Sequence, residues 1–250
     1  MNVHDLINYL FENVSQRNFL DEAALRGFSL DILKKETQRL KEEHKYPENI
    51  GKGLSELAEK YNLPYMGRGS SRRVYALSTG KVLKISRNVM GIAQTEAEVA
   101  VWTNPSTREI AARVFDFDPD YMWSVMEIAK TFNNYDRTIE NELKIPHAYG
   151  ERFTIYDIVK ELLSDRSDGK FAWDIEEKFL DLSRGQEIVL RKRLEQYLEN
   201  PHPFVLKIID LVRNNDMNIG DVISDHFGKT ADGRIVMIDY GLSEDVAKLY

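Results

Sequence analysis

The chain has 250 residues, a net charge of -7 and no cysteine. This acidic balance argues against non-specific binding to nucleic acid or to anionic membranes, and the lack of cysteine excludes disulfides, thiolate zinc sites and cysteine nucleophiles. No apolar run approaches the roughly 18 residues of a membrane span, and the first residues lack the basic start of a signal peptide. We therefore expect a soluble cytoplasmic protein without membrane or nucleic-acid partners.

Residues 1–62 are expected to form an N-terminal helical appendage. Apolar side chains recur at helical spacing over 6–14. A second helix is predicted over 29–44, with Ser29 as its N-cap, and a third over 54–61, starting after a glycine. We find no chemistry in these segments and expect their apolar faces to pack against the rest of the protein.

Residues 65–87 predict a β-hairpin, with strands around 74–77 and 82–85 joined by a turn at 78–80. The entrance of the hairpin is rich in glycine and serine. This entrance loop contains Gly67, Arg68, Gly69, Ser70 and Ser71. Glycine allows backbone amides to approach a phosphate group, and serine adds hydroxyl donors. A plain hairpin entrance without a ligand is the alternative interpretation.

Lys84 lies in the second predicted strand among apolar neighbours. Its ammonium group must therefore either point to solvent or reach a buried anion. The alanine-rich segment 91–102 predicts a helix that carries Glu96 and Glu98. If this helix packs beside the hairpin, one glutamate pairs with Lys84; we favour Glu98 and keep Glu96 as the alternative. The remaining alternative is that both glutamates lie on a solvated face of the helix.

Residues 110–129 predict two strands around a turn at 118–120, and a polar composition follows. This change marks a candidate boundary between two lobes. The region 150–213 is expected to be mostly helical. Helices are predicted over 153–163, 175–182, 187–197 and 204–212.

The stretch 220–242 combines an acidic loop with a buried strand. Residues 234–238 are largely apolar and are predicted to form the strand. Asp239 follows this strand directly, and Asp221 lies on the loop before it. Magnesium is commonly held by one or two carboxylates together with phosphate oxygens. The stretch therefore predicts a magnesium-phosphate site.

The order of these features resembles the protein-kinase-like superfamily, in particular its small-molecule-kinase branch. The Gly-x-Gly-Ser-Ser-Arg loop and the Ile-Asp-Tyr-Gly ending are also similar to short kinase-like proteins predicted in bacteriophage genomes, which would place the protein in the host cytoplasm. The resemblance covers 65–243. It implies an α+β, bilobal fold with the helical appendage (1–62), a small antiparallel β-rich N-lobe (63–129) and a reduced helical C-lobe (130–250).

The resemblance also implies a site for ATP. The entrance loop would cover the phosphates through Gly67, Gly69, Ser70 and Ser71. Lys84 would contact the α- and β-phosphates and pair with Glu98. Met126 would take the gatekeeper position, and Glu127 and Ile128 would offer backbone groups to the adenine edge.

For phosphoryl transfer, the resemblance implies that Asp239 binds Mg²⁺ and that Asp221, 18 residues earlier, accepts or orients the substrate hydroxyl proton. Two positions depart from the family pattern. Arg72 replaces the third loop glycine, and His226 stands where an asparagine metal ligand is expected. Because magnesium prefers oxygen ligands, Asp225 is the alternative ligand, and His226 alternatively makes a structural hydrogen bond.

Few residues follow Asp239, so we expect no activation segment and no platform for a peptide substrate. A small molecule, or a partner protein that supplies its own surface, fits better. Four functions remain open: an ATP- and Mg²⁺-dependent phosphotransferase, a non-catalytic pseudokinase that binds a nucleotide or partner, a nucleotidyl transferase, and a structural component of a phage particle.

Overall fold

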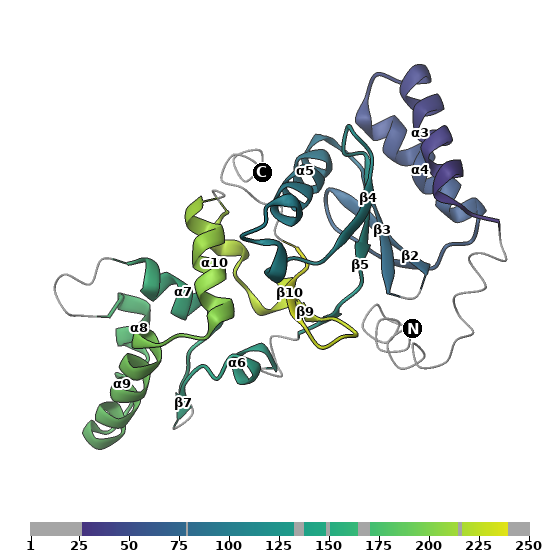
Figure 1. Cartoon of the computed structure of the whole chain (residues 1–250). Coiled ribbons are helices and arrows are strands. Elements are labelled where there is room, and N and C mark those ends of the chain that lie inside the picture. The colour runs from purple at the N-terminus through teal and green to yellow at the C-terminus, as the bar shows by residue number, and fades with distance from the viewer. Residues whose placement is uncertain are drawn as a thin grey trace.

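The computed structural model of the chain is α+β, and Figure 1 shows its arrangement. It describes residues 27–78, 80–132, 138–148, 151–164, 171–214 and 217–239. The helix predicted over 6–14, Thr79 of the predicted hairpin turn, and Tyr240 and Gly241 lie outside this part of the chain. N-terminal helices precede a five-stranded antiparallel sheet, and a mostly helical part with a small sheet follows it.

In the described part of the chain, two helices precede the large sheet: α3 (Leu30–Glu43) and α4 (Pro47–Lys60). Ser29 is the N-cap of α3, as predicted, since its hydroxyl accepts a hydrogen bond from the Ile32 amide at 3.3 Å. The start of the helix predicted over 54–61 was wrong, because α4 begins at Pro47, a residue well suited to the first helical turn. Gly51 and Gly53 lie inside α4 and do not precede it.

The large sheet has the strand order β1-β2-β3-β5-β4. Its strands are β1 (Tyr65–Arg68), β2 (Arg72–Ser78), β3 (Lys81–Ser86), β4 (Val114–Phe117) and β5 (Trp123–Glu127). Both predicted hairpins are present. Strand β1 was missed: Gly67, expected in a loop, lies in this strand opposite Val74. This strand, with one glycine and one arginine among its four residues, lacks the apolar alternation by which a strand is recognised.

Helices cover both faces of the large sheet (Figure 1). Leu83 and Ile85 of β3 pack with α3 and α4, and alternation along β3 turns Val82 and Lys84 to the opposite face. Helix α5 (Val89–Thr103) contacts that face. The predicted packing of the N-terminal helices on the body is confirmed for α3 and α4, where buried Trp123 Nε1 also donates to Thr37 Oγ1 at 2.9 Å.

The second half of the described chain is mostly helical. Its helices are α6 (Thr138–Glu142), α7 (Ile155–Leu163), α8 (Trp173–Glu177), α9 (Arg184–Glu199) and α10 (Pro203–Asn214). Short 3-10 turns are η1 (Arg108–Ile110), η2 (Ile219–Asp221) and η3 (Ser224–His226). The helix predicted over 175–182 ends early, because α8 covers only its first residues and turns follow. No helix in the described residues is long and apolar enough to cross a membrane.

A small sheet joins this half to the large sheet. It has the order β10-β9-β6, with β6 (Lys130–Thr131), β9 (Phe227–Lys229) and β10 (Ile235–Met237). The predicted strand at 234–238 is thus present as β10, whereas β9 was not expected. The Ala112 amide donates to Met237 O at 3.1 Å, and Arg234 pairs with Glu127 at 2.6 Å. Two smaller strands, β7 (His147–Ala148) and β8 (Glu151–Arg152), form a separate hairpin.

Gly51 lies where α4 approaches the end of β3. This close approach predicts that a larger residue at position 51 would lower the stability of the protein. A Cβ atom at Gly51 would collide with the carbonyl oxygen of Ser86 and lie 3.1 Å from Arg87 Cα. We expect Gly51→Ala to lower the free energy of unfolding by about 1–3 kcal/mol, as in other overpacked sites. Denaturant unfolding measures the change.

The matched control is Gly185→Ala in α9, where no atom lies within 4 Å of the added Cβ. Alanine is the better helix former, so this variant should be unchanged or stabilised by up to about 1 kcal/mol. Equal effects of the two substitutions would contradict the close packing of α4 on β3.

Candidate functional site

A cavity of about 330 Å³ lies where β1, β2, β3 and the end of β5 meet the end of β10. One part of its wall is apolar and is formed by Met66, Val74, Val82, Ala112, Met126, Ile128, Ala129 and Ile238. Another part is polar or charged and is formed by Gly69, Ser70, Ser71, Arg72, Lys84, Gln94, Glu127, Thr131, Asp225, His226 and Asp239. The cavity therefore offers an apolar surface next to a surface rich in charge.

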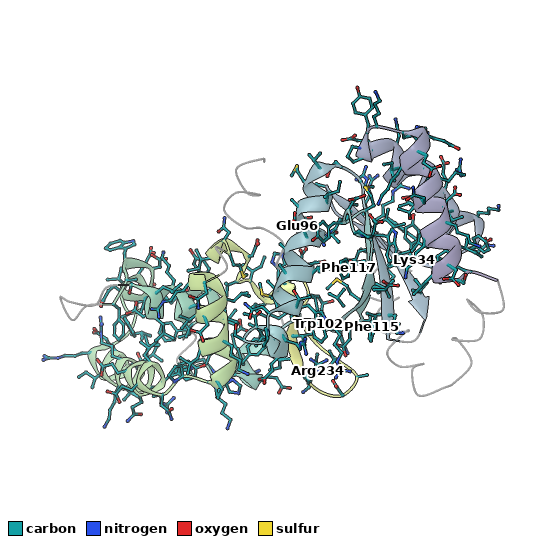
Figure 2. All side chains as sticks on the ribbon, turned by 45° about the horizontal axis from the view of Figure 1, so that its top comes forward. Lys34, Glu96, Trp102, Phe115, Phe117 and Arg234 are labelled. Carbon is teal, nitrogen blue, oxygen red and sulfur yellow. The ribbon has the colours of Figure 1, made fainter. Side chains whose placement is uncertain are left out.

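The predicted pair of Lys84 and Glu98 is present at this cavity. Lys84 Nζ lies 2.7 Å from Glu98 Oε1, and the Glu98 side chain is fully buried. Glu96, the alternative partner, is exposed on α5 (Figure 2). Lys84 Nζ also donates to Ile238 O at 2.9 Å, so one ammonium group connects β3, α5 and the end of β10.

Arg72 is a residue of this cavity whose contacts were not predicted. Its side chain is 7% exposed and bridges two carboxylates. Nη1 lies 2.7 Å from Glu98 Oε2, and Nη2 lies 2.9 Å from Asp239 Oδ1. A signal was present in the sequence, because an arginine at the start of an apolar strand needs an anionic partner once it is buried.

The charges of this network shift the ionisation of its members. Burial lowers the pKa of Lys84, against the attraction of Glu98, and the charge of Arg72 lowers it further. Burial opposes ionisation of Asp239, but the nearby Arg72, Lys84 and His226 outweigh it and lower the pKa of this carboxyl group. Asp239 is therefore held as a carboxylate beside the cavity.

The hairpin tip between β1 and β2 is anchored through its carbonyl groups. The Arg87 amide donates to Ser71 O at 2.7 Å, and Arg87 Nη1 donates to Gly69 O and Ser70 O at 3.2 and 3.3 Å. The Ser71 hydroxyl also donates to the side-chain oxygen of Gln94 on α5. Of the predicted loop residues, Gly69, Ser70 and Ser71 line the cavity.

The predicted adenine-edge segment lines the cavity, but its N–H groups are already engaged. The Glu127 amide donates to Arg113 O, and the Ile128 amide donates to Gly80 O, both at 2.8 Å. These two N–H groups are therefore engaged within the fold, and the expected contact of backbone groups of Glu127 and Ile128 with an adenine edge stays a prediction. Within the described residues, the Ala129 N–H makes no backbone hydrogen bond, and Ala129 lines the cavity.

The structure separates Asp221 from the other predicted site residues. Asp225, His226 and Asp239 line the cavity, whereas Asp221 is buried in η2 outside its lining. His226 Nδ1 lies 2.9 Å from Asp221 O, a carbonyl group that can only accept, so the ring nitrogen donates. This contact is the structural hydrogen bond considered for His226.

The sequence predicts that Asp239, with Asp225 or His226, binds Mg²⁺, and the oxygen and nitrogen donors of these side chains can be compared with what Mg²⁺ prefers. Among the described residues, no group of three or more His, Asp or Glu side chains is placed to hold a metal ion. Magnesium, however, often uses only one or two carboxylates and takes its other ligands from phosphate and water. Asp239 and Asp225 fit that smaller role; His226, with nitrogen donors, fits it poorly.

Glu98 gives a second stability prediction. Removing its carboxylate leaves two buried cations, Lys84 and Arg72, without the anion that each contacts. We expect Glu98→Ala to lower the free energy of unfolding by about 3–5 kcal/mol, the usual cost of breaking a buried ion pair from one side. The quantity is measured by chemical denaturation near neutral pH.

Glu96→Ala on the same helix is the control for this experiment. Because Glu96 is exposed, its removal should change the stability by less than about 0.5 kcal/mol. A Glu98 variant as stable as this control would show that the buried network contributes nothing to the fold.

Comparison of the chain with protein-family models and with curated proteins found no match. The kinase-like interpretation of the cavity therefore depends on the residues and contacts of this chain alone.

Proposed function

We propose that the protein is a kinase-like phosphotransferase that uses ATP and Mg²⁺ and acts on a small molecule or a protein. The observation that carries the proposal is the pair of Lys84 and Glu98 on the wall of a cavity. In protein kinases the phosphate-binding lysine lies on the third strand and pairs with a glutamate of the next helix. Lys84 on β3 and Glu98 on α5 have the same relation.

The apolar part of the cavity suits the base of a nucleotide. Val82 and Met126 face each other on β3 and β5, and Ala112 and Ile128 extend the same surface. Apolar walls with a few convergent polar groups are typical of small-molecule sites. The Ala129 N–H is then the backbone donor for the base edge, because the N–H groups of Glu127 and Ile128 are engaged within the fold.

The charged part of the cavity suits the phosphates. Lys84 supplies a cation, and the tip of the β1–β2 hairpin supplies the glycine and serine positions that line the same space. Asp239 and Asp225 are the residues that would hold Mg²⁺. When bound, this ion neutralises negative charge on the phosphate oxygens.

Asp221 is proposed to accept or orient the proton of the substrate hydroxyl group. Its carboxylate is buried outside the cavity lining, and its backbone carbonyl is tied to His226. Transfer therefore requires this loop to shift so that the carboxylate reaches the substrate. Binding of the nucleotide requires no such shift.

This position of Asp221 favours a second candidate function, a pseudokinase that binds a nucleotide without transferring phosphate. The contact of Asp239 with Arg72 points the same way, because it engages the proposed metal ligand. Turnover distinguishes the two candidates. The mass added to a substrate would distinguish phosphoryl from nucleotidyl transfer.

The test of nucleotide binding is a calorimetric titration with Mg²⁺-ATP. We expect Lys84→Met to weaken binding by at least about tenfold, the equivalent of one charge-assisted hydrogen bond. Lys81→Met is the matched control, because Lys81 lies on the same strand, outside the cavity lining, with its ammonium group 4.5 Å from the centre of the Phe115 ring. This variant should bind as the wild type does.

Asp221→Asn then separates binding from transfer. It should leave Mg²⁺-ATP affinity within about threefold of the wild type, since Asp221 is outside the cavity lining, and abolish turnover. A wild-type protein that binds no nucleotide contradicts both candidate functions. Binding without turnover under all substrate conditions supports the pseudokinase.

A further inference from the structure

Arg72 contacts one oxygen of the Asp239 carboxylate, the group proposed to bind a metal ion. Its Nη2 lies 2.9 Å from Asp239 Oδ1, while Nη1 is held 2.7 Å from the fully buried Glu98 carboxylate. The guanidinium group is itself buried and lines the cavity next to Ser71 and Lys84. The proposed metal ligand Asp239 is therefore already paired with a permanently charged guanidinium group.

The position of Arg72 is fixed from several directions. Arg72 begins β2, and its carbonyl accepts a hydrogen bond from the Gly69 amide at 3.0 Å, which closes the hairpin tip. The contact with Glu98 fixes the guanidinium group of Arg72 to α5. A metal ion that coordinates Asp239 Oδ1 would therefore have to replace an established ion pair.

The guanidinium group also matches the ligand that the cavity is proposed to bind. Its planar array of N–H donors suits phosphate oxygens, and it is never deprotonated at physiological pH. Arg72 and Lys84 line the cavity together and present two cations to one space. These charges offset part of the negative charge of a polyphosphate, a task otherwise performed by a divalent ion.

We propose that Arg72 acts as a built-in cation of the site. The cavity binds the polyphosphate of a nucleotide without a divalent metal, and a metal ion reaches Asp239 only by displacing Arg72. This inference depends on the proposed nucleotide site and adds to it the source of the neutralising charge. Arg72 is in this view a direct phosphate ligand, whereas Glu98 positions it.

The test compares ATP affinity in excess Mg²⁺ with ATP affinity in EDTA, measured by calorimetry on the full chain. For the wild type we expect the two dissociation constants to agree within about threefold, because the gain from the metal is offset by the displacement of Arg72. For Arg72→Gln we expect binding in EDTA to weaken by at least about tenfold, while binding with Mg²⁺ persists. Retained binding with Mg²⁺ also shows that this variant is folded.

Arg73→Gln is the matched control, because Arg73 is the next residue of β2 and its Nη1 pairs with Glu59 at 3.4 Å, away from the cavity. It should show the wild-type ratio of the two constants. If Arg72→Gln binds in neither condition, Arg72→Lys decides, because it keeps a positive charge. A ratio within about threefold in Arg72→Lys supports the inference, and a tenfold or larger requirement for Mg²⁺ overturns it.

The outcomes separate this inference from the proposed function. A wild type that binds ATP only with Mg²⁺, or an Arg72→Gln variant with the wild-type ratio, overturns the role of Arg72 and leaves the nucleotide site standing. A wild type that binds ATP in neither condition overturns the nucleotide site and this inference with it.

Discussion

The fold depends on one buried carboxylate, that of Glu98. Each of its oxygens faces a different cation, Lys84 at one side and Arg72 at the other, at 2.7 Å in both cases. Two buried cations without this anion would carry a large desolvation cost. Because the three residues lie on α5, β3 and β2, the contacts of Glu98 with both cations fix how the helix sits on the large sheet.

The same network extends to the far end of the described chain. Lys84 donates to Ile238 O, and Arg72 pairs with Asp239, so both cations hold the segment that follows β10. Apolar contacts act in the same direction, since Val236 packs in one cluster with residues of the large sheet and α5. Residues separated by more than a hundred positions thereby form one cavity wall. The charge network and this apolar cluster together hold the segments that line the cavity.

Part of this arrangement can be predicted from the sequence, where the spacing of apolar residues indicates a strand or a helix. The apolar residues over 82–85 predict β3, and Lys84 among them needs an anion because the structure buries it. Glu98, unlike Glu96, lies on the buried face of α5, although the helical spacing of Ile92, Val99 and Trp102 does not by itself distinguish the two glutamates. The weakly patterned β1 and β9 escaped notice because they are short and lack apolar alternation, although each pairs with the next strand along the chain, β1 with β2 and β9 with β10.

Arg72 shows why the chemistry of the site was harder to predict than its location. Its two anionic partners lie 26 and 167 positions away in the sequence, and only the folded chain brings them together. Once they meet, Asp239 has two possible roles: partner of an arginine in the fold, and ligand of a metal in a reaction. The first is present in the structure and needs no ligand. The contacts that the proposed nucleotide site uses are therefore already formed, whereas the proposed phosphoryl transfer additionally requires Asp239 to exchange its partner and Asp221 to reach the cavity.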